Sequence, residues 1–167
     1  MKAVTQQEEM ERIEAVIEMM GAIPLFDKIA STQLRIIAEH MEIVQLHARG
    51  LLFSEGHNSD YMCFVVDGTL GVLKQSDNGK RVKVSTLSRG RSIGEMALLD
   101  TFPRSATVIA ETECTLLTIS RDSFDKILDR HPRADISSLK SIARVLSLNL
   151  HRASLSYRRS VYSCQTA

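Results

Sequence analysis

The sequence lacks several features that mark whole classes of protein. Its 167 residues carry 21 Lys or Arg against 20 Asp or Glu, so the net charge of +1 shows none of the basic excess that is typical of nucleic-acid-binding proteins. No apolar run approaches the roughly 18 residues of a membrane span. The N-terminus, MKAVTQQEEMERIE, is too acidic and too polar for a signal peptide. We therefore expect neither specific DNA binding nor a membrane span.

Cysteine is scarce as well. Cys63, Cys114 and Cys164 are widely spaced and form no CxxC pair, which argues for a reducing compartment and against a disulfide framework or a structural zinc site. The five histidines share no ligand spacing with one another or with a cysteine, so no metal is expected. These observations leave the cytoplasm as the default location.

What the chain does contain divides into three regions. Hydrophobic residues make up 44% of it and charged residues 25%, which is ordinary for one globular domain of this length. The first region, residues 1–23, is predicted to be an amphipathic helix that ends at Gly21, before Pro24. Its apolar residues recur at spacings of 3, 4 and 3, namely Met10, Ile13, Ile17 and Met20.

The second region, residues 24–133, changes from a helical period to short β-type runs. A short helix comes first, from Ser31 as its N-cap to about His40. Asn78-Gly79 then predicts a hairpin with a type I′ turn, because both residues tolerate a positive φ. A mainly β sandwich, jelly roll or small barrel with flanking helices is therefore expected. The runs are IVQL, YMCFVV, TLGVL, RVKVSTL, SATVIA and CTLLTIS.

The third region, residues 134–167, predicts a long helix and a basic tail. After a short helix opened by Ser123-Phe124 and broken at His131-Pro132, apolar residues hold a heptad register to Tyr157, with a second apolar stripe beside the first. One interpretation is a helix lying along the domain. We favour a symmetric dimer through residues 134–157. The register comprises Ile136, Leu139, Ala143, Leu146, Leu150, Ala153 and Tyr157.

The segment GEMALLDTFPRSAT, residues 94–107, has the composition of a site for a sugar phosphate. Gly94 allows a tight approach to a helical turn, and the free N–H groups of that turn attract an anion. Glu95 would repel a phosphate, so we expect it to accept a hydrogen bond from a sugar hydroxyl. Arg104 supplies a planar fork for the phosphate, while Ser105 and the small Ala106 complete the cradle. The alternative is a structural ion pair between Glu95 and Arg104 at a surface turn.

These residues closely resemble the phosphate-binding cassette of cyclic nucleotide-binding domains. PLFDKI, FSEG, VVDG and LLTISRDSFDKIL fit the same family in order, so the resemblance spans about residues 24–150. It implies a double-stranded β-helix, or jelly-roll, barrel with N-terminal helices and a long C-terminal helix. It also implies a cyclic AMP or cyclic GMP ligand, with Glu95 on the ribose 2′-hydroxyl and Arg104 on the exocyclic phosphate oxygens. The implied binding residues are Gly94, Glu95, Met96, Ala97, Leu98, Arg104, Ser105 and Ala106.

The expected function is a stand-alone, non-catalytic receptor. About ten residues follow Tyr157, too few for a helix-turn-helix, and the chain shows no nucleophile motif. The resemblance implies that a shift of the long helix and of a hinge near residues 121–133 would pass the signal to an unknown partner protein. Ser105 hints at cyclic AMP, because cyclic-GMP-selective members often carry Thr there.

Two other functions stay open. One is a module for a cyclic dinucleotide. The other is a ligand-free scaffold that acts through its basic C-terminal helix, because residues 136–167 hold basic residues and no acid. Those basic residues are Lys140, Arg144, Arg152, Arg158 and Arg159.

Overall fold

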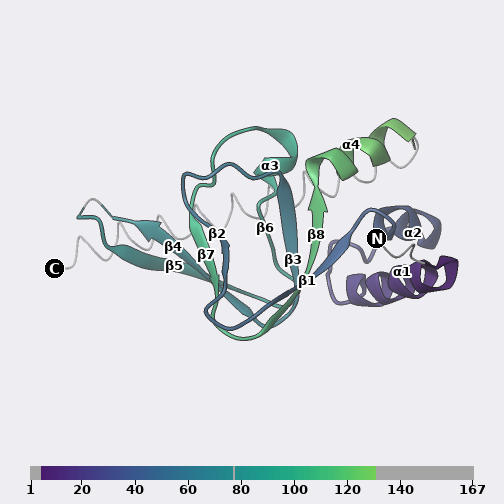
Figure 1. Cartoon of the computed structure of the whole chain (residues 1–167), viewed down its shortest axis with the longest axis horizontal. Coiled ribbons are helices and arrows are strands. Elements are labelled where there is room, and N and C mark those ends of the chain that lie inside the picture. The colour runs from purple at the N-terminus through teal and green to yellow at the C-terminus, as the bar shows by residue number, and fades with distance from the viewer. Residues whose placement is uncertain (1–4, 77, 131–167) are drawn as a thin grey trace.

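The computed structural model describes residues 5–76 and 78–130. Their strands form two four-stranded antiparallel sheets (Figure 1). The first sheet has the order β1 (Glu42–Leu46), β8 (Cys114–Ser120), β3 (Tyr61–Asp67), β6 (Ser92–Ile93). The second has the order β2 (Leu51–Phe53), β7 (Thr107–Ala110), β4 (Thr69–Gln75), β5 (Arg81–Ser88).

The expected mainly β architecture with flanking helices is confirmed, but the two sheets are not closed into a barrel. β1 and β6 are the edges of one sheet and β2 and β5 the edges of the other. The chain passes between the sheets through tight turns. At the turn between β3 and β4, Gly68 has a φ of +89°, and a Cβ there would lie 2.2 Å from the carbonyl oxygen of Glu113. Only glycine fits this crossing.

The position of β3 in its sheet explains why its sequence, YMCFVV, is a continuous apolar run. Alternate side chains of a strand face opposite sides of the sheet. Cys63 is buried at 0% exposure, and Val65 packs between the two sheets with Leu116. Met62 and Phe64 pack on the other face, in a cluster beneath the helices. Since both faces are covered, neither can be polar.

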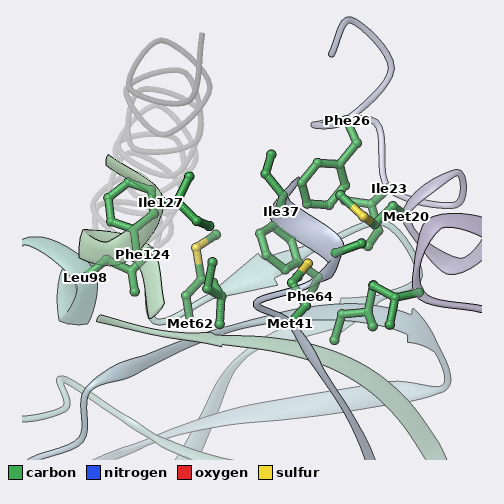
Figure 2. Packing of buried hydrophobic residues seen from close by; sticks show 14 of the residues in the cluster. Met20, Ile23, Phe26, Ile37, Met41, Met62, Phe64, Leu98, Phe124 and Ile127 are labelled. Carbon is green, nitrogen blue, oxygen red and sulfur yellow. The ribbon is translucent and has the colours of Figure 1, made fainter. Parts of the chain in front are cut away.

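The helices cover the outer face of the first sheet. α1 (Gln6–Met20) begins with a capping box between Thr5 and Glu8 and buries Val16 and Met20 in the same cluster as Phe64. α1 and α2 (Ser31–Ala38) lie together beside β1, and α4 (Arg121–Arg130) follows β8 (Figure 1). Figure 2 shows the cluster: Leu98, Phe124 and Ile127 gather at one end, and Met20, Ile23 and Phe26 at the other.

Three predicted details were wrong. Ala30, not Ser31, precedes the first turn of α2, and Ser31 lies inside the helix. α4 begins at Arg121 instead of Ser123, because the Ser120 hydroxyl accepts the N–H of Ser123 at 3.1 Å and so caps the helix earlier.

The third concerns the hairpin that joins β4 to β5. The Ser76 N–H donates to the Lys80 carbonyl at 2.9 Å, and the Gly79 N–H to the Ser76 carbonyl at 2.8 Å. The loop is therefore longer than the two residues of a type I′ turn, with Gly79 in the left-handed region at φ +77°. The hairpin projects from the body of the two sheets (Figure 1).

Several expectations stay predictions. None of the helices within 5–76 and 78–130 is long and apolar enough to cross a membrane. The long helix at 134–157, its two apolar stripes and the basic tail lie outside the described residues. The division into residues 1–23, 24–133 and 134–167 is likewise a prediction.

Candidate nucleotide-binding site

A glycine and one helical turn build the first wall of the site. Gly94 follows β6 with a φ of +87°, and Glu95 is the N-cap of α3 (Met96–Leu99). The Ala97 N–H donates to the Gly94 carbonyl at 3.0 Å, which fixes the turn. A Cβ on Gly94 would lie 2.3 Å from a guanidinium nitrogen of Arg104. Gly94 therefore supplies both the backbone conformation and the room for Arg104.

Arg104 is buried, with 7% of its surface exposed. Its Nη1 donates to the Gly94 carbonyl at 3.4 Å, its Nη2 to the Tyr61 carbonyl and its Nε to the Ser59 hydroxyl. Its main-chain N–H donates to the His57 carbonyl at 2.8 Å. The loop between β2 and β3 thus holds Arg104 by both its main chain and its side chain.

Two aromatic rings complete the environment of the guanidinium. The central carbon of the Arg104 guanidinium lies 4.0 Å from the centroid of the Phe53 ring and 5.0 Å from that of Tyr61. The rings themselves are 6.3 Å apart in an edge arrangement. Such contacts favour a cation electrostatically and orient its plane.

The electrostatics of Arg104 are those of a cation removed from water. Burial lowers the pKa of Arg104, and the nearby Cys63, Tyr61, Glu95 and Asp60 raise the same pKa. Its hydrogen bonds go to one hydroxyl and two carbonyls, which are neutral acceptors. Burial also raises the pKa of the Cys63 thiol to about 12, so this thiol is neutral at physiological pH.

The space between these parts is a pocket of about 110 Å³. Seven of the eight predicted binding residues line it: Gly94, Glu95, Met96, Ala97, Arg104, Ser105 and Ala106. Leu98 does not. Its side chain is 4% exposed and packs in the cluster beneath the helices with Phe124 and Ile127 (Figure 2).

Four further residues of this site carry no individual signal in the sequence. Phe53 and Phe102 line the pocket, and Ser59 and Tyr61 hold Arg104. FSEG, which contains Phe53, contributes to the family resemblance but indicates no contact with Arg104. Ser59 sits in HNSDY, a polar loop without a pattern, and its contact with Arg104 joins residues 45 positions apart.

A second arginine connects the site to α4. The Nε of Arg121 donates to the Ala97 carbonyl at 2.8 Å, and its Nη2 donates to the Asp100 carbonyl. The main-chain N–H of Arg121 donates to the Asp60 carbonyl at 2.6 Å. The first residue of α4 is therefore bonded to the end of α3 and to the start of β3.

Comparison with known proteins identifies the family. The family model described as "Cyclic nucleotide-binding domain" matches residues 43–131, which include both walls of the pocket. The chain belongs to this family. A cAMP-dependent protein kinase regulatory subunit of Blastocladiella emersonii is 33% identical over 124 residues, covering 74% of this chain and 30% of that protein. The chain spans less than a third of the length of such curated relatives.

Two solved structures share the fold. A cyclic nucleotide-binding domain from Methylobacillus flagellatus has a TM-score of 0.78 at 24% identity, covering 92% of this chain and 84% of that one. The regulatory subunit of a cAMP-independent protein kinase A from Trypanosoma cruzi, bound to guanosine, has a TM-score of 0.72 at 18% identity. It covers 94% of this chain and 52% of that chain.

Proposed function

We propose that this chain is a receptor for a cyclic mononucleotide, cyclic AMP or cyclic GMP, and that it is not an enzyme. The observation that carries the proposal is the buried Arg104 guanidinium, which lines a pocket and whose side-chain hydrogen bonds, among the described residues, go to neutral oxygens. A buried cation gains most from an anionic partner, and a guanidinium matches two phosphate oxygens at once.

Each predicted residue takes a role in this arrangement. Arg104 binds the exocyclic phosphate oxygens, and Glu95 accepts the ribose 2′-hydroxyl. Gly94, Ala97 and Ala106 keep the main chain close to the phosphate, and Ser105 adds a hydroxyl. Leu98 joins the cassette to the core through its side chain, and Met96 is half-exposed at the rim.

The signalling part of the proposal concerns the C-terminal region. Binding shifts the segment that begins at α4, and residues 134–157 form a homodimer and a lid over the base. A downstream protein then reads the change. Placement in the cytoplasm belongs to the same proposal. Cyclic AMP is our first candidate on the strength of Ser105, and a cyclic dinucleotide is the alternative ligand.

The test is calorimetry with Arg104 variants. Removing one member of a buried charge pair costs about 2–5 kcal/mol, so Arg104→Ala should weaken cyclic AMP binding about 30-fold to several thousand-fold. Arg104→Lys should recover part of this, because an ammonium is a point charge. Arg89→Ala, which removes the same charge from an exposed position, is the matched control and should bind normally.

The ligand panel separates the alternatives. Cyclic AMP, cyclic GMP, a cyclic dinucleotide and guanosine should be titrated into protein stripped of co-purified ligand, with thermal melts to confirm folding. Tight binding of the dinucleotide alone selects the alternative ligand. Binding of guanosine as tightly as cyclic AMP, or unchanged binding in Arg104→Ala, would show that the phosphate is not where we place it.

A further inference from the structure

A second cavity, of about 260 Å³, lies between the edge strands β1 and β2 and shares no residue with the pocket at Arg104. Its lining combines apolar surface, including Val44 and Leu52, with polar side chains. Its polar lining comes from the end of α2, from β1, β3 and β8 and from α4: His40, Glu42, Asp60, Tyr61, Thr118, Ser120 and Ser123.

Thr118 shows that this cavity is built for a polar occupant. It lines the cavity and is only 8% exposed, so more than nine-tenths of it is buried. Its hydroxyl has no hydrogen-bond partner among residues 5–76 and 78–130, whereas Thr115, on the same strand, donates to the Gln45 side chain at 3.0 Å. A buried hydroxyl without a partner costs free energy, and a polar ligand in the cavity removes that cost.

The lining offers acceptors more than donors. His40 Nδ1 lies 2.9 Å from the Ile36 carbonyl, and because a carbonyl only accepts, this nitrogen carries a proton that points away from the cavity's occupant. The Tyr61 hydroxyl donates its hydrogen bond to the Leu52 carbonyl at 2.9 Å, so the hydroxyl oxygen can still accept a hydrogen bond. The carboxylates of Glu42 and Asp60 add negative charge.

The basic residues of an adjoining groove have carboxylate partners of their own. Arg12 and Lys126 line an adjoining groove that also includes His40, Glu42 and Ser123. Arg12 pairs with Glu9 at 2.6 Å, and Lys126 pairs with Asp122 at 2.5 Å. Glu42 and Asp60 are not members of the ion pairs found within the described part of the chain, although Glu42 lies near enough to Arg12, and Asp60 near enough to Arg104, to raise the pKa of that arginine.

We propose that this cavity binds a small aliphatic ammonium. Its N–H groups would donate to Thr118, Glu42 and Asp60, and its methylene groups would lie on Val44 and Leu52. A directly coordinated metal ion fits less well, because the described residues contain no group of three His, Cys, Asp or Glu side chains close enough to hold one. The proposal does not depend on nucleotide binding.

The occupant would touch residues that also support the nucleotide site. The carbonyl of Asp60 accepts the main-chain N–H of Arg121, and the carbonyl of Tyr61 accepts from Arg104. An ammonium bound at the Asp60 carboxylate would therefore touch the residue that accepts from Arg121, and the next residue in the chain is the one that accepts from Arg104. Any coupling between the two sites must be reciprocal. If a nucleotide changes the affinity for the ammonium by some factor, the ammonium changes the affinity for the nucleotide by the same factor.

The experiment is an NMR titration of the nucleotide-free, ¹⁵N-labelled chain with n-butylammonium, with butyrate as the matched anion. We expect saturable shifts at the amides of Glu42, Asp60, Thr118 and Ser123 with the cation and none with the anion. Shifts that do not saturate, or that butyrate reproduces, overturn the proposal.

Variants locate the contacts. Thr118→Val keeps the shape and removes the hydroxyl, and Glu42→Gln removes a charge. Each should weaken butylammonium binding about tenfold or more, the usual effect of one hydrogen bond to a charged group. Thr115→Val removes the hydroxyl on the same strand that lies outside the cavity and should bind normally. If Thr118→Val does not fold, Glu42→Gln alone decides, and wild-type affinity in that variant overturns the site.

Discussion

The guanidinium carbon of Arg104 lies 4.0 Å from the centroid of the Phe53 ring, on a strand that the phosphate-binding sequence motif does not include. The contact has a consequence for binding. The ring fixes the plane of the guanidinium before a ligand arrives, and a group ordered in advance loses less conformational entropy on binding. Phe53 is therefore a positioning residue for Arg104, under the proposed function.

We predict that Phe53→Leu weakens cyclic nucleotide binding by about 0.5–2 kcal/mol, or roughly 2-fold to 30-fold, the range of a cation–π contact. Phe53→Tyr keeps an aromatic face and should bind nearly as wild type. Both are measured by calorimetry, with thermal melts because Phe53 is also part of the core.

Phe102→Leu is the control for the loss of an aromatic ring from the same pocket. Phe102 is 66% exposed and lines the pocket, but the rings stacked on Arg104 are those of Phe53 and Tyr61. If Phe53→Leu and Phe102→Leu weaken binding equally, the ring of Phe53 contributes apolar contact and not the orientation of Arg104.

The contrast between Phe53 and Glu95 shows what could be predicted from the sequence. Gly94, Glu95, Arg104 and Ser105 stand within one short segment, so their order alone predicted a common site, and the structure places them around one pocket. The neighbours of Arg104 could not be predicted, because Phe53, Ser59 and Tyr61 reach it only after β2 and β3 have formed.

The same distinction explains the fold. Alternating and continuous apolar runs predicted the strands. A strand buried on one face needs an apolar side chain at every second position, and a strand buried on both faces needs one at every position. Whether the strands close into a barrel depends on hydrogen bonds between edges far apart in the sequence. The start of α4 depends on a single side chain. The Ser120 hydroxyl accepts the N–H of Ser123, so the helix begins at Arg121 and not at Ser123.

The second prediction concerns the sugar. Glu95→Gln keeps an acceptor for the ribose 2′-hydroxyl but makes a charge-assisted hydrogen bond neutral, so binding of cyclic AMP should weaken by about 1–2 kcal/mol. The preference for cyclic AMP over its 2′-deoxy analogue should narrow at the same time. Calorimetry with both ligands measures this. If Glu95→Gln still prefers cyclic AMP over the 2′-deoxy analogue as strongly as wild type does, the Glu95 carboxylate does not contact the sugar.

The third prediction tests the proposed dimer. Leu146 and Leu150 are neighbouring positions of the heptad register, and Glu at both would bury like charges against their copies. Analytical ultracentrifugation of the double variant should show a monomer whose far-UV circular dichroism retains the β signal. Leu155→Glu, which changes an apolar residue outside the heptad register, is the control and should remain dimeric. A double variant that stays dimeric places the dimer contact elsewhere.

The last prediction concerns how the nucleotide site reaches α4. Arg121 is the first residue of α4, and its side chain donates to the carbonyls of Ala97, in α3, and of Asp100, which follows α3. Ligand that orders α3 should therefore also order α4 through this residue. In wild type we expect cyclic AMP to slow amide hydrogen exchange in residues 94–100 and also in residues 121–130.

Arg121→Gln should separate the two effects, because glutamine lacks the charge and the fork that span both carbonyls. Exchange should still slow in residues 94–100 but respond little in residues 121–130. Lys126→Gln, which removes a basic residue from the exposed face of the same helix and breaks its pair with Asp122, should behave as wild type. If ligand protects α4 in Arg121→Gln as fully as in wild type, the two elements are coupled through the shared core of Leu98, Phe124 and Ile127 instead.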